Sequence, residues 1–412
     1  DILTFSIPEQ NANTQISKTQ HTVTINVAAG TDLSSLTPTL TVSSGGSSSP
    51  NTGATQDFSS PVSYTVEAEN GTTQTWTVTV TPLYVWDGSA WNHTQPAAAD
   101  LARLDGDYDT NTDGNLTALD LTISTGVNVN IAPNTYIHVA GDLKHQGANF
   151  TVESGGTLLT KGSVTGTNFT FERITTFDEN TGRYSIVGSP VANQSFATLG
   201  ASSIVYGYDE TEAYTLGVND GLDRFKTPSQ LSQTTLQEAQ GYFSAKTGDG
   251  NGKITFSGTP FHGDRSITLT RTDHPAEEDG FEGFNLVANP YPAAIDFTTF
   301  IQDNVSAIEG AVYLWDDFDS DSNRGINDDY VVVNEMGHVD SRKSGFSKWD
   351  GNIRSMQGVV VQAKSGGTLQ VNFNDDMKVA ANNTDGSYFR STQTATSFKL
   401  ILENEMGDYS ET

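Results

Sequence analysis

A degenerate internal repeat within residues 173–392 constrains the fold of this 412-residue chain more than any other feature. Four strand-like segments of its first part recur in the same order in its second part. The matched pairs are Tyr184–Pro190 with Phe284–Pro290, Val205–Asp209 with Val312–Asp316, Gln240–Lys246 with Gln357–Lys364, and Ile254–Ser257 with Val371–Asn374. The repeat predicts two tandem β-rich halves, residues 173–275 and 276–392, the second with loop insertions. The halves are either two sandwiches or two parts of one larger domain.

Alternating apolar and polar residues predict a small antiparallel β-sandwich over residues 1–82. His21–Val27 and Thr75–Val80 alternate with period two, as half-buried strands do. Asn70-Gly71 stands between two such stretches and favours a hairpin. The unit is Ig-like in architecture only, because the Cys…Trp…Cys pattern of true immunoglobulin domains is missing.

Residues 83–172 have a different pattern of strands and turns. Strand-like runs of about eight residues alternate with turns rich in Gly, Ser, Pro and Asn, which predicts a short β-solenoid or β-roll. A meander in a second sandwich is the alternative. Helix is limited to two short candidates, near residues 228–239 and 295–303, and residues 393–412 read as the start of a further, truncated β domain. The predicted fold class is therefore all-β: an Ig-like β-sandwich, a solenoid, and two tandem related sandwich-like halves.

Composition excludes several classes of function. The chain has 21 Lys and Arg against 50 Asp and Glu, a formal net charge of −29. A surface this acidic does not favour nucleic acid or anionic membranes. The absence of cysteine excludes disulfides, thiolate zinc sites and cysteine nucleophiles. No run approaches the roughly 18 apolar residues of a membrane-spanning helix, so no direct membrane insertion is expected.

An acidic loop in the second half has the spacing of calcium ligands. Alternate side chains of an extended loop point to one side and so converge on one hard cation. The candidate ligands are Asp317, Asp319, Asp321 and Asn323, with Asp328 at the place of the last ligand of an EF-hand loop. The alternative is a solvated acidic insertion.

A second, weaker calcium candidate has a better formal match. Asp109, Asn111, Asp113 and Asp120 fit an EF-hand or dockerin-type pattern. However, strand-like residues follow the loop where the motif requires a helix, and Asp-Gly turns are common between strands. Ca²⁺ is the one cofactor that the sequence suggests.

No catalytic motif is recognisable. The seven histidines lack metal-ligand spacing, and there is no nucleophile elbow, P-loop or dinucleotide fingerprint. Glycosidase carboxylates cannot be identified either, because among 50 acids some pair always lies close. We therefore expect no catalytic residue and no enzyme activity in this region.

Aromatic side chains are the candidates for sugar binding, since flat rings stack on pyranose faces. They are Trp86, Trp91, Tyr206, Tyr208, Tyr291, Tyr313, Trp315 and Trp349. The alternative is ordinary packing. Tyr206 and Tyr313 hold equivalent positions of the repeat, as core residues would, and Trp86 and Trp91 flank a turn.

Several segments resemble non-catalytic regions of large Bacteroidota cell-surface and secreted proteins that the type IX secretion system exports. They are Asn285–Pro292, Val312–Asp316 and Met356–Val361, the solenoid-like stretch Leu119–Leu158, and the Ig-like module of residues 1–82. The resemblance covers nearly the whole chain, which reads as a fragment of a longer protein.

The resemblance implies a location and a class of function. It implies a non-catalytic structural or adhesive segment of an extracellular or outer-cell-surface protein. The alternative is an accessory or glycan-binding region of a secreted polysaccharide-degrading enzyme. The expected partners are surface glycans or other cell-surface or secretion-system proteins.

Overall fold

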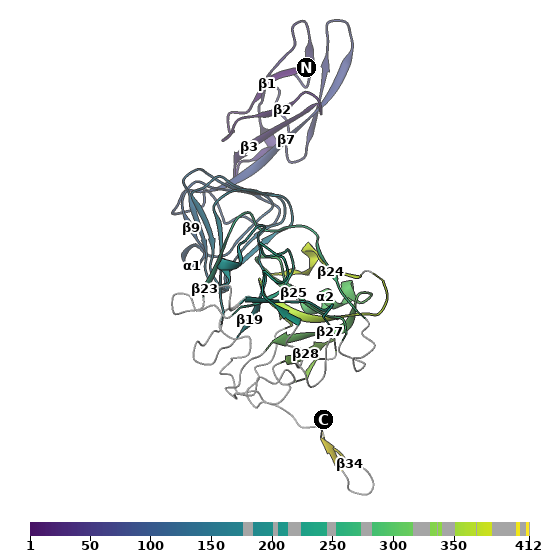
Figure 1. The fold of residues 1–412 in the computed structure, drawn as a ribbon. Helices are drawn as coiled ribbons and strands as arrows, with labels where there is room; N and C mark the ends of the chain where they lie inside the picture. Colours follow the sequence, from purple (N-terminus) through teal and green to yellow (C-terminus); the bar gives the residue numbers. More distant parts are fainter. Residues whose placement is uncertain are drawn as a thin grey trace.

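The computed structural model describes residues 1–175, 184–200, 205–212, 224–244, 253–272, 282–315, 330–335, 337–339, 351–367, 369–380, 401–403 and 409–411. Helix accounts for 7% of the structure and strand for 48%, which confirms the all-β prediction. Figure 1 shows the sandwich at one end, the solenoid in the middle, and the sheets of the two halves at the other end. Within the described residues, no helix is long and apolar enough to cross a membrane.

The N-terminal sandwich forms because its apolar alternation places one face of each strand in a shared core. Trp76 and Tyr64 are fully buried there, and the predicted Asn70-Gly71 hairpin joins two of its strands. The strands are β1 (Ile2–Ser6), β2 (Gln15–Ser17), β3 (Thr22–Ala28), β4 (Thr39–Val42), β5 (Ser47–Ser49), β6 (Val62–Glu67) and the first part of β7 (Thr73–Trp86), with the 3₁₀ helix η1 (Leu33–Ser35). Strands β1 and β4 pair on one side, and the others form the second sheet.

Strand β7 continues through the domain boundary predicted at residue 82. It pairs with β6 over Thr73–Val78, in parallel with β3 over Thr77–Leu83, and in parallel with β8 (Leu101–Leu104) over Leu83–Trp86. One sheet of order β17-β14-β11-β8-β7-β3-β2 therefore extends from the solenoid into the sandwich.

The loop after β7 supports this connection. The Asn92 side chain donates to the carbonyl of Leu83 (3.2 Å) and accepts from the amide of Val85 (2.9 Å). The His93 ring lies so close to Gly30 of the sandwich that an added Cβ would be 2.7 Å from it. The joint between sandwich and solenoid is thus packed as well as hydrogen-bonded.

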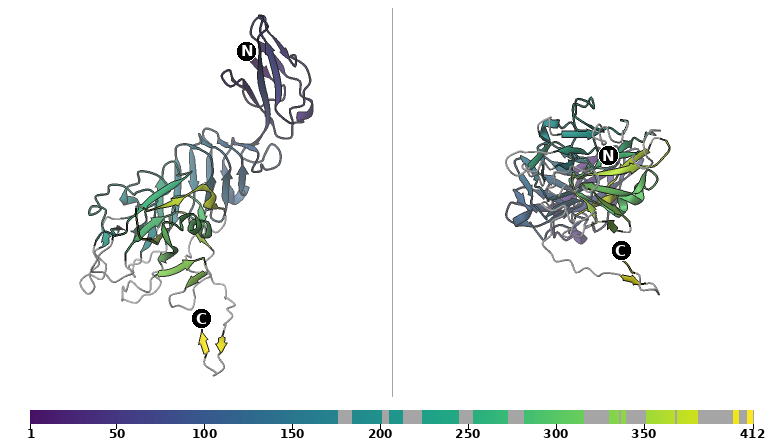
Figure 2. Two further views of the ribbon diagram at one scale, coloured as in Figure 1. Left: turned by 90° about the vertical axis from the view of Figure 1, so that its right-hand side faces the viewer. Right: turned by 60° about the horizontal axis from the view of Figure 1, so that its bottom comes forward.

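The solenoid consists of parallel coils with three faces, which confirms the solenoid over the meander. Hydrogen-bonded equivalent positions lie 21 or 22 residues apart, as between Asp107 and Asn128 and between Asp120 and Asp142. The first face consists of β8, β11 (Leu121–Ile123), β14 (Leu143–His145) and β17 (Val164–Gly166). The second consists of β9 (Tyr108–Asp109), β12 (Asn128–Ile131), β15 (Asn149–Val152) and β18 (Phe169–Ile174). The third consists of β10 (Leu116–Ala118), β13 (Tyr136–Val139) and β16 (Thr157–Thr160). Figure 2 shows the coils stacked beside the sheets of the two halves.

The two halves contain sheets with the same strand order. The first has the order β19-β22-β20-β21, and the second β25-β31-β27-β28-β29. Their bounds are β19 (Ser185–Val187), β20 (Val205–Tyr208), β21 (Phe225–Lys226), β22 (Tyr242–Ser244), β25 (Phe284–Ala288), β27 (Ile308–Trp315), β28 (Tyr330–Asn334), β29 (Gly337–Val339) and β31 (Gly358–Ala363). The segments matched by the sequence repeat occupy corresponding strands, so the order is that of a duplicated unit.

The two sheets meet at a crossing of β19 and β25. Val187 bridges to Gln357 of the second half, and Val287 bridges to Gln240 of the first. The amide of Gly188 donates to Met356 (3.0 Å), and that of Ala288 donates to Ala239 (2.8 Å). Met356 and Ala239 both have positive φ, 59° and 56°. Because each contact of one half recurs in the other, the crossing is pseudo-symmetric.

Two strand pairs attach the halves to the solenoid and to each other. Strand β23 (Lys253–Ser257) pairs with β18, and the corresponding β32 (Leu369–Phe373) pairs with β24 (Arg265–Leu269). Strand β18 thus belongs to both the solenoid and the first half, and the boundary predicted at residue 172 falls inside it. The other elements are β26 (Ala294–Asp296), β30 (Asn352–Ile353), β33 (Lys378–Val379), β34 (Ile401–Glu403), β35 (Tyr409–Glu411), α1 (Thr110–Asp113), α2 (Phe297–Asn304), η2 (Phe196–Thr198) and η5 (Asp375–Met377).

Of the two predicted helices, one is present. Helix α2 lies within residues 295–303 and one residue beyond, capped by the Asp296 side chain, which accepts from the Thr299 amide (2.8 Å). Residues 228–239 form turns instead, so that prediction was wrong. Ser232 and Ala239 adopt positive φ, 56° each, which an α-helix does not permit.

Candidate functional site

The first calcium candidate lies outside the described residues. Its five ligands, Asp317, Asp319, Asp321, Asn323 and Asp328, belong to residues 316–329. Calcium binding there stays a prediction from the sequence.

The second calcium candidate is placed, and its side chains serve local hydrogen bonds. Asp109 caps helix α1 by accepting from the amide of Asn111 (2.9 Å), and Asp113 accepts from the amide of Asp109 (2.8 Å). Asp120 lies at a solenoid corner and accepts from the amide of Asp142 on the next coil (2.8 Å). In the part of the chain that the structure describes, no three His, Asp or Glu residues form a metal-binding group.

Three predicted sugar-binding aromatics are packed elsewhere, and one is not placed. Trp86, Trp91 and Tyr108 form a ring cluster at the first solenoid coil, with Trp86 Nε1 donating to the carbonyl of Asp107 (2.8 Å). Tyr291 is fully buried, and Trp349 lies outside the described residues. These positions fit the packing alternative.

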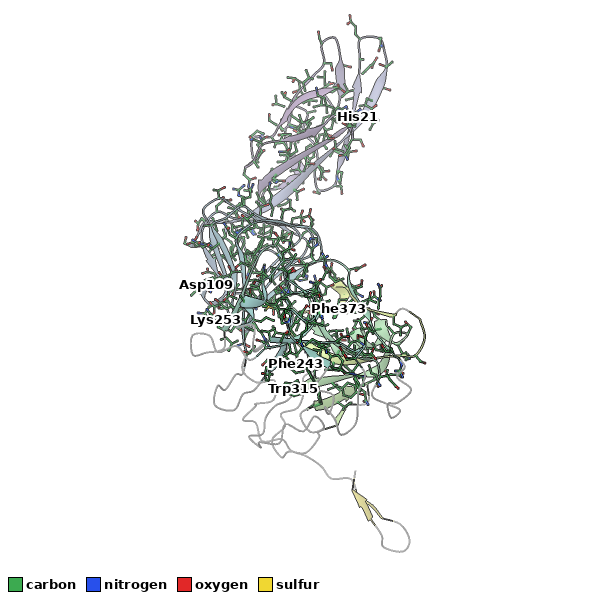
Figure 3. The ribbon with its side chains drawn as sticks, in the orientation of Figure 1. His21, Asp109, Phe243, Lys253, Trp315 and Phe373 are labelled. Atoms are coloured by element: carbon green, nitrogen blue, oxygen red, sulfur yellow. The ribbon has the colours of Figure 1, made fainter. Side chains whose placement is uncertain are left out.

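The other four predicted aromatics come together where the two halves meet. Tyr206, Tyr208, Tyr313 and Trp315 are half-buried around four buried residues, Ile186, Phe243, Leu286 and Val360. Phe243 of the first half meets Trp315 of the second edge to face, with ring centroids 5.1 Å apart (Figure 3). We call this cluster the aromatic seam: the four buried residues with Tyr184, Tyr206, Tyr208, Phe225, Phe284, Tyr313, Trp315 and Tyr330.

The seam repeats itself across the crossing. Strand register makes Tyr206 equivalent to Tyr313, because they pair with Phe243 and Val360, the equivalent residues of β22 and β31. Tyr208 opposite Phe225 likewise matches Trp315 opposite Tyr330, with ring centroids 5.5 and 5.0 Å apart. The duplicated sequence thus builds a duplicated set of rings.

Close approach of the two halves requires glycine at equivalent positions of β31 and just before β22. A Cβ added to Gly358 would lie 2.1 Å from the Ile186 side chain of the first half, and one added to Gly241 would lie 3.0 Å from the carbonyl oxygen of Val287 of the second half. Sequence reasoning named four seam residues and missed the other aromatic ones. The period-two pattern within the repeat could have found them, since Tyr184 and Phe284 are the first residues of equivalent segments of the repeat.

Charges that border the seam are paired. Lys226 forms an ion pair with Glu212 (2.8 Å), and Arg271 lies 3.5 Å from Glu282. The buried Arg224 donates to the Tyr208 hydroxyl (3.3 Å) and to the carbonyl of Glu212 (2.8 Å). Burial, with a smaller effect of the Glu309 carboxylate, raises the pKa of Tyr313. The seam itself contributes rings and hydroxyls, but no ionised group.

The joint between the solenoid and the second half holds a buried lysine that the sequence did not reveal. The Lys378 side chain is 2% exposed, contacts Asp375, donates to the carbonyl of Thr160 (2.7 Å), and lies 4.3 Å from the centre of the Tyr291 ring. Burial lowers the pKa of Lys378, and Asp375 opposes this. The cluster is a structural joint, because the Asp375 carboxylate also accepts from the Gly263 amide (3.1 Å).

Two family models match parts of the chain. The model of a domain of unknown function, DUF8693, matches residues 86–405. A model described as SGBP, N-terminal, matches residues 2–80. No curated protein matches the chain.

Two solved structures are similar to parts of the chain. A candidate glycoside hydrolase from Bacteroides thetaiotaomicron is 35% identical over 20% of this chain and 24% of its own length, with a TM-score of 0.19. A candidate secreted protein from Bacteroides fragilis is 20% identical over 20% of this chain and 94% of its own length, with a TM-score of 0.17. Such low TM-scores support no argument about the fold or the activity.

Proposed function

The chain belongs to the family of the domain of unknown function DUF8693, and we propose that it is a non-catalytic, glycan-binding region of a bacterial cell-surface or secreted protein. The observation that carries the proposal is the match of residues 2–80 to the N-terminal domain of SGBP, a name that stands for surface glycan-binding protein. The sequence resemblance to Bacteroidota surface proteins agrees with it. Export by the type IX system remains a prediction from that resemblance.

The distribution of aromatic residues supports a division of labour between the modules. In the sandwich, Phe5, Phe58, Tyr64 and Trp76 are all buried, so this module offers no ring to a sugar. Half-buried rings gather instead in the aromatic seam. We therefore assign glycan contact to residues 86–405 and a spacer role to the sandwich.

Affinity gel electrophoresis of the intact chain tests the proposal. We expect slower migration in gels that contain a recognised polysaccharide and unchanged migration in gels without one. The same polysaccharides should release no reducing ends on incubation with the chain. Migration that no surface or plant polysaccharide retards would refute glycan binding, and release of reducing ends would refute the non-catalytic assignment.

A structural or adhesive role is the second candidate, and the continuous strand β7 favours it. A spacer needs a fixed geometry, and the parallel strands of one sheet join the sandwich to the solenoid. In this case the chain would bind no polysaccharide, but would hold a partner module of the longer protein at a set distance.

Calcium binding by the loop of residues 317–328 is a further proposal, supported by ligand spacing alone. Millimolar calcium should raise the melting temperature slightly, with a gain of about 0.4–1.4 kcal/mol for a Kd of roughly 10⁻³ to 10⁻⁴ M. Asp319→Ala should abolish this gain. Sodium at matched ionic strength is the control, because general screening of the net charge also stabilises. Equal effects of both salts would show that no specific site exists.

A further inference from the structure

The aromatic seam contains a polar atom that its own packing does not satisfy. Within the described residues, the indole Nε1 of Trp315 is buried and has no hydrogen-bond partner. A buried donor without an acceptor is costly, and native cores rarely keep one. The equivalent position of the first half holds Tyr208. The duplicated structure therefore places an amphipathic ring at both positions, where a core alone would be served by Phe or Leu.

From this arrangement, we propose that the aromatic seam is the glycan-contacting site of the chain and that its ligand is a neutral polysaccharide. The inference rests on the proposed function and specifies its site and substrate class. A sugar supplies both groups that the seam calls for: apolar C–H faces for stacking on rings, and hydroxyl oxygens as acceptors for an N–H donor. Because the Trp315 Nε1 is buried, contact with such an oxygen requires the side chain to rotate on binding.

Charge selects a neutral ligand over an acidic one. Of the described cations that border the seam, Lys226 and Arg271 already face Glu212 and Glu282. The third, Arg224, is buried and donates to the Tyr208 hydroxyl (3.3 Å) and to the carbonyl of Glu212 (2.8 Å). The carboxylate of Glu309 acts on Tyr313, and the chain as a whole has a net charge of −29. A uronate polymer would meet repulsion and would find no paired recognition by arginine or lysine.

The duplication also predicts how affinity depends on ligand length. The ring pairs Tyr208–Phe225 and Trp315–Tyr330 repeat on the two sides of the seam. A ligand with a repeating unit can contact both sides at once, whereas a monosaccharide can contact only one. Because the second contact then forms within one complex, affinity should rise steeply with oligosaccharide length.

Binding of the intact chain and its variants to a defined panel tests the inference. The probes are neutral soluble polysaccharides (glucans, mannans, galactans and xylans) and polygalacturonate, measured by affinity electrophoresis and then by titration of oligosaccharides from the bound polymer. Trp315→Ala and Tyr208→Ala should each weaken binding about tenfold or more, as the loss of a central aromatic contact does. Trp91→Ala is the matched control. It removes a half-buried ring at the first coil of the solenoid, outside the seam, and should leave binding unchanged.

Trp315→Phe separates binding from folding. It keeps a six-membered aromatic ring in the seam and removes the N–H donor with the five-membered ring of the indole. It should therefore lower the melting temperature less than Trp315→Ala does and still weaken binding. If the wild type binds neutral polymers and both alanine variants bind them equally well, the seam is refuted as the site, while the proposed function stands. Preference for polygalacturonate would refute the neutral class. No binding by the wild type would refute the proposed function itself.

Discussion

At the scale of single residues, Lys378 shows how a buried charge holds two parts of the chain together. It connects Asp375 of η5 with the carbonyl of Thr160 on the solenoid. Removing one partner of a buried ion pair leaves the other charge uncompensated. We expect Lys378→Met to lower the free energy of unfolding by about 3 kcal/mol, measured by chemical denaturation.

The double variant Lys378→Met/Asp375→Asn is the control for this interpretation. It removes both charges, so it should recover part of the lost stability, although the carbonyl of Thr160 still lacks its donor. A double variant less stable than Lys378→Met would show that the ion pair is not the cause.

His145 makes a second residue-scale prediction, on the pH dependence of stability. It is buried in the solenoid core against Phe150 and Phe169, its Nε2 has no partner among the described residues, and burial lowers its pKa. Above the unfolded pKa of about 6.5 both states are neutral at this residue. Below it, the unfolded state takes up a proton that the folded state resists, so stability falls as the pH falls.

We expect the wild type to lose up to about 1.4 kcal/mol per pH unit from this group below pH ~6.5. His145→Leu should reduce that loss, with melting temperatures compared at several pH values between 7.5 and 5. Burial also lowers the pKa values of His138 and His262. Both residues remain in the variant, so its melting temperature still decreases with falling pH, but less steeply. Identical slopes for wild type and variant would contradict the prediction.

At the scale of elements, the crossing of β19 and β25 depends on glycine at one of two equivalent positions. A Cβ added to Gly188 would lie 2.3 Å from the Cβ of Ala288. Gly188→Ala should therefore destabilise the chain by about 1–3 kcal/mol, as overpacking does. The exchange variant Gly188→Ala/Ala288→Gly again has one methyl group at the crossing instead of two, and it should recover most of the melting temperature. Failure of the exchange to recover stability would mean that the crossing is not pseudo-symmetric at this point.

The elements were largely predictable, because their signals are local. Period-two alternation and Asn70-Gly71 identify the sandwich strands, and short runs between turns identify the solenoid coils. The domain boundaries have no such local signal in the sequence. Strands β7 and β18 each serve two modules, and sharing of a strand depends on which neighbours it pairs with in space.

The candidate site was predictable only in part, for the same reason. Tyr206, Tyr208, Tyr313 and Trp315 stand out in the sequence, but their convergence depends on the crossing of two strands 100 residues apart. Asp120 is the opposite case, because its predicted role beside Asp109 depends on sequence spacing alone. Their spacing matches a calcium loop, yet the solenoid places Asp120 at a corner, where it bonds to the next coil. The buried position of Lys378 could not be predicted, because it depends on a contact with Thr160, which is distant in the sequence.

At the scale of the whole molecule, the shared strands imply that the modules move as one body. A flexible linker has few contacts across it, whereas β7 pairs with β3 as far as Leu83 and with β8 from Leu83 onward, so its ladder is unbroken through the predicted boundary. The contacts of Asn92 and His93 add to this joint. The spacer role proposed for the sandwich requires such rigidity.

Distance measurements between spin labels test this rigidity directly. The chain has no cysteine, so Gln74→Cys on the sandwich part of β7 and Lys144→Cys on the solenoid place two labels at exposed positions without background labelling. We expect one narrow distance distribution for this pair. Insertion of Gly-Ser-Gly-Ser after Pro82 interrupts β7 between its parallel pairing with β3 and its parallel pairing with β8. It should broaden the distribution, because Gly/Ser segments behave as flexible coils. A broad distribution without the insertion would show that the sandwich moves freely, and the chain could not then act as a fixed spacer.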